Sequence, residues 1–311
     1  MKDKHTFGGQ AVIEGVMMKS PNYYSVAVRK PDNSITVRLE EDKSILHKYK
    51  IFKLPFFRGI ASLFHMLVIG TKALTYSAEE ALEDGKKESR NLSTLTLIST
   101  IIFSLAFAIA LFVILPYYLT HIIGLKEDTQ TFIFNLVDGA IKLLIFILYI
   151  IVIGFMHDIK RVFQYHGAEH KAINCYEANK KLNVKNVQSF STLNPRCGTS
   201  FLVFVIMLGI LLLSLIPSLI LLIYPNFFDL PLLLNRTILL ASRILFLLPI
   251  AGVSYEFLKF TARYRKNIFM KLFILPGYGI QLLTTKEPDN DQVEVGIKAL
   301  NVVIEKEKHK H

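Results

Sequence analysis

The chain has no tryptophan and only two cysteines, Cys175 and Cys197, in 311 residues. Two cysteines cannot build a disulfide scaffold or a metal site made of thiolates alone, so we expect the chain to reside in a reducing compartment. The first ten residues contain charged side chains and no apolar run, so we expect no cleavable signal peptide. The sequence also lacks internal repeats and low-complexity tracts.

Hydrophobic residues, in contrast, make up 52% of the chain, and its mean hydropathy is +0.40. A soluble domain needs more polar residues than this to cover its core. The net charge is +11, because 36 lysines and arginines outnumber 25 acidic residues. In a membrane protein, such positive charge orients the chain in the membrane and attracts it to anionic lipid. Contact with a ribosome is also left open. No motif indicates recognition of a specific nucleic-acid sequence.

Four apolar stretches have about the 20 residues that a helix needs to cross the hydrocarbon core of a membrane. Lysines and arginines gather in residues 1–91, 157–199 and 258–311, whereas the short connections 120–131 and 225–236 contain one each. Because positive segments remain inside, we predict a multi-pass cell-membrane protein whose two termini and central loop face the cytoplasm. The four stretches are Leu95–Leu119, Phe132–Met156, Ser200–Tyr224 and Thr237–Phe257.

The stretch Leu54–Leu82 is apolar enough to be considered as a fifth span. Its polar residues, however, recur at spacings that place them on one stripe of a helix, as Arg58, His65 and Lys72 illustrate. We therefore predict an amphipathic helix that lies in the cytoplasmic interface of the membrane.

Charged residues are rare inside the four predicted spans, and three of them are expected to form a cluster. Asp138 and Lys142 are four residues apart on the second span and can neutralise each other, and Arg243 lies near the same end of the bundle. We predict a structural charge cluster. A transport pathway is the alternative, because charges within a membrane are often functional.

The polar segments are predicted to fold. Gln10–Met18, Ser25–Arg29 and Ile35–Leu39 have the composition of strands, and Asp289 with Gln292 matches a capping box before a terminal helix. The expected fold class is an α-helical polytopic membrane protein of about four spans with a small α+β cytoplasmic module. Its expected segments are 1–50 (β-rich), 51–91 (interfacial helix), 92–156 (two spans), 157–199 (central loop), 200–257 (two spans) and 258–311 (C-terminal cytoplasmic segment).

The central loop contains His166, Glu169 and His170 in the order His-x-x-Glu-His, the inverted zincin pattern. On a helix, two histidines four residues apart project from one face, which is the spacing needed to hold one Zn²⁺. Glu169 lies beside them and could accept a proton, and Glu177 could be a further ligand if the helix ends or bends there. The alternative is a basic interfacial helix whose histidines face lipid headgroups, and Gly167 counts against a rigid metal site.

Cys197 follows Arg196 just before the third predicted span, whose helix Thr199 or Ser200 can cap. The neighbouring cation and the positive end of the helix both favour the thiolate form of the cysteine. This thiolate could be a third metal ligand or a nucleophile assisted by a histidine. The alternative is a capping loop with a neutral cysteine. Cys175 falls on the opposite helix face from the two histidines and is left out of the site.

Near the N-terminus, Glu14 stands in an apolar stretch and is followed by Gly15. A carboxylate in this setting is predicted to point inward from a strand, so Glu14 is a second candidate for a general base. The stretch lacks the GxxxxGK[ST] pattern of a phosphate-binding loop.

Three segments together resemble the YqhQ-like family of bacterial membrane proteins: Gly8–Met18, His166–Lys171 and Arg196–Phe201. Thr284–Pro288 and Gln292–Val295 add to the likeness, which covers nearly the whole chain. The family carries the label of a predicted metal-dependent enzyme, without an established reaction. The resemblance therefore implies that these segments belong to one site. The residues expected to support that site are Gln10, Lys171, Asn174 and Arg196.

The leading hypothesis is a membrane-embedded, metal-dependent hydrolase at the cytoplasmic interface, with zinc as the favoured divalent ion. A lipid-linked or membrane-protein substrate is expected, because both candidate elements adjoin spans. The alternative is a non-catalytic docking or assembly factor that binds the translocon with its ribosome, or anionic lipid, through its basic cytoplasmic face. In the enzyme, the metal ligands would be His166, His170 and either Cys197 or Glu177, and the general base would be Glu169 or Glu14.

Overall fold

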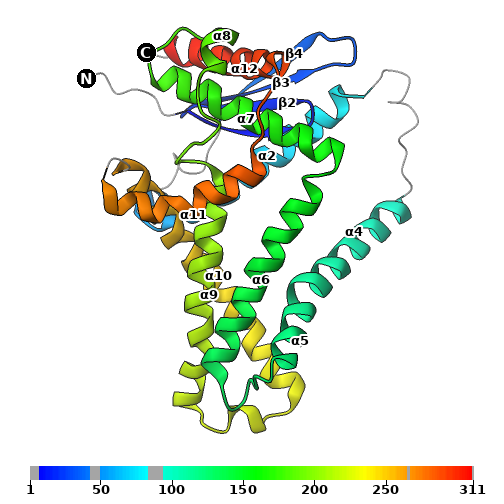
Figure 1. The fold of residues 1–311 in the computed structure, drawn as a ribbon, viewed down its shortest axis with the longest axis vertical. Helices are drawn as coiled ribbons and strands as arrows, with labels where there is room; N and C mark the ends of the chain where they lie inside the picture. The colour runs from blue at the N-terminus through cyan, green and yellow to red at the C-terminus, as the bar shows by residue number, and fades with distance from the viewer. Residues whose placement is uncertain (1–6, 43–49, 83–93, 265–266, 310–311) are drawn as a thin grey trace.

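The computed structural model describes residues 7–42, 50–82, 94–264 and 267–309, so parts of the predicted segments 1–50 and 51–91 lie outside the described residues. Figure 1 shows a small module of sheet and helices at one end of a group of long helices. The module contains strands β1 (Gly8–Val12), β2 (Gly15–Lys19), β3 (Tyr23–Arg29) and β4 (Ile35–Glu41), and helices α7 (His157–Glu177), α8 (Val184–Gln188) and α12 (Asn290–Lys308). The other elements are η1 (Lys50–Lys53), α2 (Phe57–Glu80), α4 (Thr94–Ile109), the π-helix η2 (Ala110–Ile114), α5 (Leu115–Ile122), α6 (Thr131–Ile153), α9 (Gly198–Ile223), η3 (Phe227–Asp229), α10 (Leu232–Arg263) and α11 (Ile268–Thr284).

The four strands form an antiparallel sheet in the order β1-β2-β3-β4. The predicted strands at 25–29 and 35–39 are confirmed as parts of β3 and β4. The prediction of a single strand over 10–18 is wrong, because a turn at Ile13 and Glu14 divides it into β1 and β2. Glu14 has a φ of 50°, a left-handed conformation that belongs to a turn and not to an extended strand.

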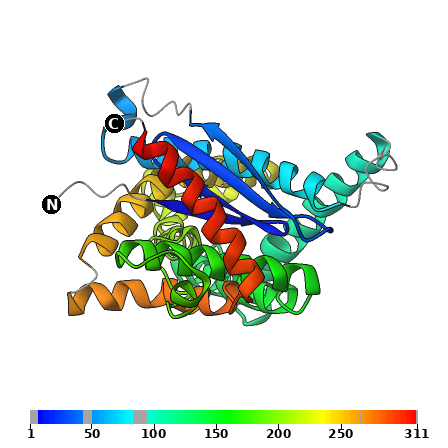
Figure 2. The same ribbon diagram turned by 90° about the horizontal axis from the view of Figure 1, so that it is seen from above.

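Helices cover both faces of the sheet, with α12 lying across it in Figure 2. Val16 and Met18 of β2 pack toward α7 and α12, whereas Met17 between them packs toward Ile69 of α2. Because successive side chains of a strand point to opposite faces, a strand buried on both faces is a continuous apolar run. The predicted capping box at Asp289 is confirmed at the start of α12.

Five helices in the described part of the chain are long and apolar enough to cross a membrane, by length and composition. Four correspond to the predicted spans: Ile102–Ile122, α6, α9 and α10. The fifth is α2, which runs across the ends of the long helices, next to the sheet (Figures 1 and 2). Its Ala73 is buried against the sheet, and its Gly59 lies against Tyr255 of α10.

The helix α11 was not predicted within the segment 258–311. Its 17 residues are fewer than the roughly 20 of a typical membrane-crossing helix, and it lies across the end of α9 (Figure 1). Gly277 and Gln281 of α11 contact Ser200 of α9. This helix carries the chain from the end of α10 back to the module, where Thr284 reaches α7.

Candidate metal centre

Both candidate histidines lie on α7, where four residues make slightly more than one helical turn. The rings of His166 and His170 are therefore neighbours, with centroids 4.4 Å apart. His170 is almost completely buried, and His166 is half-buried near the surface of the module. The two rings share one face of α7, as their spacing predicts.

Backbone carbonyl groups determine which nitrogen of each ring faces inward. The Nδ1 atom of His166 lies 3.0 Å from the carbonyl oxygen of Thr284, and the Nδ1 atom of His170 contacts the carbonyl oxygen of Thr192. A carbonyl oxygen only accepts, so both Nδ1 atoms donate their hydrogen and both Nε2 atoms keep a lone pair. Metal-binding histidines are oriented in this way.

Cys197 brings a sulfur atom to these Nε2 atoms from a different part of the chain. It is itself the N-cap of α9, in place of the predicted Thr199 or Ser200, and its Sγ accepts a hydrogen bond of 3.4 Å from the N–H of Thr199. Sγ lies 3.2 Å from Nε2 of His166, and one ligand atom from each of His166, His170 and Cys197 lies within 4.8 Å of the others. Around a tetrahedral zinc ion such ligands lie about 3.3–3.8 Å apart, so these three atoms form a group that could hold a metal ion.

Glu169 adds a carboxylate to the three ligand atoms. Its Oε2 lies 3.6 Å from Nε2 of His170 and 4.0 Å from Nε2 of His166. Strand β1 covers this side chain so closely that a Cβ at Gly9 would lie 2.7 Å from Cγ of Glu169. Burial raises the pKa of Glu169 to about 7, against a smaller opposing effect of His166. A carboxyl group in this position can hold or release a proton near neutral pH.

Two of the predicted supporting residues hold the loop that leads to Cys197. The side-chain nitrogens of Lys171 and Asn174 donate to backbone carbonyls within the segment 188–193, at 2.8 to 3.0 Å. Lys171, buried on α7, also forms an ion pair of 2.7 Å with Glu287. The helix that carries the histidines therefore also fixes the path of the loop that carries the sulfur.

Gln281 of α11 holds the next part of the same loop, a role that was not predicted from the sequence. Its Oε1 accepts a hydrogen bond of 2.8 Å from the backbone N–H of Asn194. Its Nε2 donates to the carbonyl oxygen of Asn194 at 2.8 Å and to Oγ of Ser200 at 2.7 Å. A fully buried glutamine in an apolar helix needs such partners, and that composition was the signal that could have identified it.

The segment after α11 crosses α7 at Gly167. A Cβ there would lie 2.1 Å from the carbonyl oxygen of Lys286, whose N–H donates to the carbonyl of Phe163 at 2.9 Å. Gly167, which in the sequence counted against a rigid site, instead permits the close backbone approach that brings Thr284 to His166.

Three predicted site residues have partners that lie away from His166, His170 and Cys197. Glu177 is the last residue of α7, about three turns beyond His166, and its carboxylate forms an ion pair with Arg196. Glu14 accepts two hydrogen bonds of 2.5 Å from Arg161. Gln10 points to the other face of the sheet, against α2. In the described residues, the group of mutually close ligand atoms therefore contains neither Glu177 nor Glu14.

The three charged residues predicted within the spans line one cavity. Lys142 forms an ion pair with Asp138, as their spacing predicts. Arg243 instead donates a hydrogen bond of 2.7 Å to Oδ1 of Asn135.

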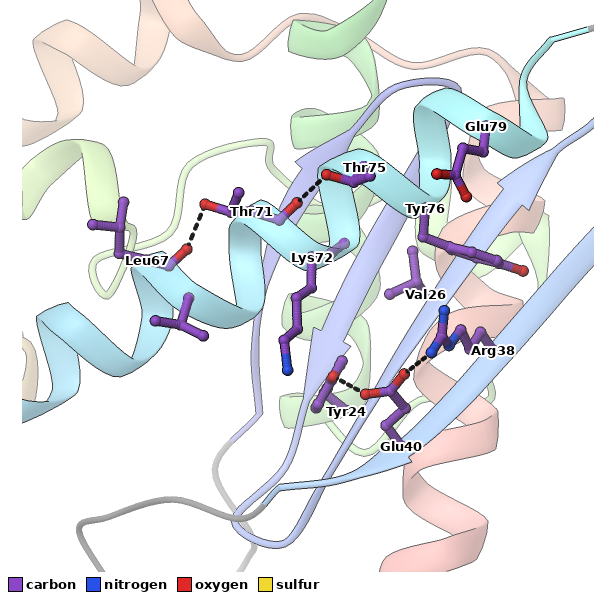
Figure 3. A pocket seen from close by; sticks show the side chains of 12 residues that line it. Tyr24, Val26, Arg38, Glu40, Leu67, Thr71, Lys72, Thr75, Tyr76 and Glu79 are labelled. Carbon is purple, nitrogen blue, oxygen red and sulfur yellow. Dashed lines mark hydrogen bonds and ion pairs between the residues drawn. The ribbon is translucent and has the colours of Figure 1, made fainter. Parts of the chain in front are cut away.

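A groove of about 710 Å³ lies on the opposite side of the sheet, between α2 and strands β3 and β4 (Figure 3). Glu40 accepts a hydrogen bond from Tyr24 and forms an ion pair of 2.5 Å with Arg38. The lining of the groove includes none of His166, His170 and Cys197. The groove is thus a feature separate from the candidate metal centre.

Comparison with known proteins identifies a family and a relative that each match most of the chain. The model of a family described as "Protein of unknown function (DUF1385)" matches residues 54–306. The chain is 36% identical over 308 residues to the uncharacterized protein YqhQ of Bacillus subtilis (strain 168), an alignment that covers 96% of this chain and 92% of that protein. No solved structure matches. These findings confirm the resemblance to YqhQ, and the chain belongs to the DUF1385 family.

Proposed function

We propose that the chain is a multi-pass membrane protein and a zinc-dependent hydrolase whose active site lies at the cytoplasmic boundary of the membrane. The observation that carries this proposal is the convergence of two Nε2 atoms and one Sγ atom beside the buried carboxylate of Glu169. Hydrolysis needs an electrophilic centre, which a zinc ion held by these three atoms would supply, and a group that accepts a proton, which Glu169 would supply.

In this proposal, His166, His170 and Cys197 would hold the zinc ion, with the cysteine as thiolate. When bound, the ion would supply Lewis-acid chemistry. The carbonyl groups of Thr284 and Thr192 keep the two Nε2 atoms turned toward the ion site. Glu169 would hold or accept a proton at Oε2.

The proposed substrate is lipid-linked or a membrane protein. Cys197 caps α9, one of the helices that could cross a membrane. A substrate held in the bilayer would therefore reach the site without leaving the bilayer. The proposed orientation has a direct test in intact cells. A single cysteine at Lys180 should be shielded from a membrane-impermeant thiol reagent, and one at Asn226 should react; the reverse pattern overturns the orientation.

Metal content is the first test of the proposed centre. The full chain, purified in detergent without added chelator, should contain about one zinc ion per chain by elemental analysis. His170→Ala should lose it, because two remaining ligands cannot hold zinc tightly. His157→Ala is the matched control, because this histidine is exposed on the same helix and should leave the metal content unchanged. A metal-free wild-type chain contradicts the enzyme proposal.

Catalysis is tested separately with Glu169→Gln. This variant should keep its zinc but lose turnover, because the amide cannot accept the proton. Purified chain would be incubated with a total membrane extract, and the products compared by mass spectrometry of lipids and peptides. A product formed by the wild type and not by Glu169→Gln supports hydrolysis. If the extracts treated with the zinc-loaded wild type and with the variant contain the same products, the hydrolysis proposal is contradicted.

A second candidate function is a non-catalytic docking factor in which the metal has a structural role. The burial of His170, Glu169 and Cys197 favours it, because closed metal sites with little access are typical of structural zinc. Such a factor should co-purify with a large membrane complex in a salt-sensitive manner. Binding should survive Glu169→Gln and weaken when the exposed lysines of the central loop are replaced by glutamine. These are Lys180, Lys181 and Lys185.

A further inference from the structure

A cavity of about 280 Å³ lies among α6, α9 and α10, in the part of the chain that could cross a membrane. Its walls are mostly apolar, with polar side chains from three helices. Asn135, Asp138 and Lys142 come from α6, Ser214 from α9 and Arg243 from α10. The geometry of this group, rather than the presence of charge alone, points to a ligand.

The internal pairing of the group is incomplete. Lys142 pairs with Oδ2 of Asp138, and Arg243 donates to Oδ1 of Asn135. The side chain of Asp138 is only 7% exposed, yet its Oδ1 has no hydrogen-bond partner in the described residues. Among the described residues, two cations therefore share the cavity with one carboxylate. This leaves one positive charge without a counter-charge and Oδ1 of Asp138 without a donor.

Both deficits are costly in apolar surroundings. An uncompensated charge within a membrane-spanning bundle is strongly unfavourable, and a buried oxygen without a hydrogen bond costs about 1–3 kcal/mol. A simple anion such as chloride would neutralise the charge but leave Oδ1 unsatisfied. Water would satisfy Oδ1 but leave the charge.

We propose that this cavity binds a small monovalent oxyanion that retains one O–H group. The oxygens of the anion would accept hydrogen bonds from Lys142 and Arg243, and its O–H would donate to Oδ1 of Asp138. The bound state is then electrically neutral. Because a water molecule occupies about 30 Å³, the cavity has room for such an ion together with several waters.

The site would lie well inside the bundle. Asp138 is seven residues after Thr131, the first residue of α6, so it lies about 10 Å along the helix. If α6 crosses the membrane as proposed, the anion is held below the headgroup level. Lipid phosphate does not reach that depth, which favours a small soluble ion.

Hydrogencarbonate and nitrate form a matched pair of probes, because both are planar monovalent oxyanions and only hydrogencarbonate has an O–H group. The full chain in nanodiscs of zwitterionic lipid would be titrated with each at pH 8 by calorimetry. Hydrogencarbonate should bind about tenfold more tightly than nitrate, the ratio expected for one hydrogen bond to a charged acceptor. Equal affinities, or no saturable binding of either ion, overturn the proposal.

Two variants separate the two interactions. Asp138→Leu should remove the preference for hydrogencarbonate while nitrate still binds, and retained nitrate binding also shows that the cavity is folded. Arg243→Gln should weaken the binding of both ions by about tenfold or more. Lys298 is an exposed lysine of α12 outside the bundle, so Lys298→Gln should change neither affinity. A preference that persists in Asp138→Leu, or affinities that Arg243→Gln leaves unchanged, contradict the assignment.

Discussion

The Nε2 atom of His166 and the Sγ atom of Cys197 lie 3.2 Å apart, although 31 positions separate the two residues in the chain. His166 belongs to the helix that packs on the sheet, and Cys197 caps a helix that could cross a membrane. This contact therefore joins the module to the long helices. A metal ion held between the two residues would add its binding free energy to the stability of that junction.

The proposed zinc site should depend on pH in a defined direction. Zinc requires neutral imidazole rings and a thiolate, so protons compete with the metal and affinity should fall as the pH decreases from 8 to 6. Each proton displaced contributes about a tenfold change per pH unit below the pKa of its group. Competition with a chromogenic chelator measures this slope. Cys197→Ser should bind zinc more weakly and with a shallower slope, and an affinity independent of pH contradicts the proposed ligands.

Gly167→Ala should destabilise the contact between α7 and the segment after α11. The new methyl group would meet the carbonyl oxygen of Lys286 at 2.1 Å, and overpacking of this kind costs about 1–3 kcal/mol. We expect a lower melting temperature and weaker zinc binding, because displacement of the segment also moves Thr284. Gly279→Ala is the control, since no atom of the described residues lies within 4 Å of its added Cβ and alanine favours a helix. Equal melting temperatures for the two variants are the result that would count against this account.

Gln281→Leu should weaken zinc binding from a distance. The leucine fills a similar volume but leaves the buried backbone N–H of Asn194 without its partner, at about 1–3 kcal/mol. It also removes one of the two hydrogen bonds to the carbonyl oxygen of Asn194, which then keeps only the bond of 3.3 Å from the N–H of Cys197. The loop that positions Cys197 should loosen, so the zinc affinity and the melting temperature should both fall. Gln130→Leu, an exposed residue before α6, should change neither. A lower melting temperature with an unchanged zinc affinity would show that Gln281 does not support the metal centre.

Glu307→Leu should detach the end of α12 from the sheet. The carboxylate of Glu307 is buried and accepts hydrogen bonds from Ser20, at 2.6 Å, and from the side chain of Asn22, at 2.5 Å. Removing the charged acceptor breaks these hydrogen bonds and should cost about 2–3 kcal/mol. Hydrogen exchange of the β2–β3 turn should accelerate. Glu305 lies on the exposed side of the same helix, so Glu305→Leu serves as the control. Equal exchange rates in the two variants would disprove the anchoring role of Glu307.

Local patterns were sufficient to predict much of the fold. The apolar runs identified four of the five long apolar helices, and the capping box at Asp289 identified the start of α12. The four-residue spacing of His166 and His170 predicted their shared face. Local patterns failed at two places. The turn at Glu14 interrupts an apolar stretch without the usual Asn-Gly or Asp-Gly pair, and α11 was hidden in a segment predicted only as a C-terminal cytoplasmic segment.

The sequence by itself determined which side chains could bind a metal, because residue type and helical spacing are local properties. Only the tertiary structure decided which of them meet. Cys197 joins the histidines, and Glu177, equally plausible by type, pairs with Arg196 instead. The physical reason is that a convergent site depends on long-range contacts. Here these are the crossing at Gly167 and the loop held by Gln281, and no local pattern specifies either one.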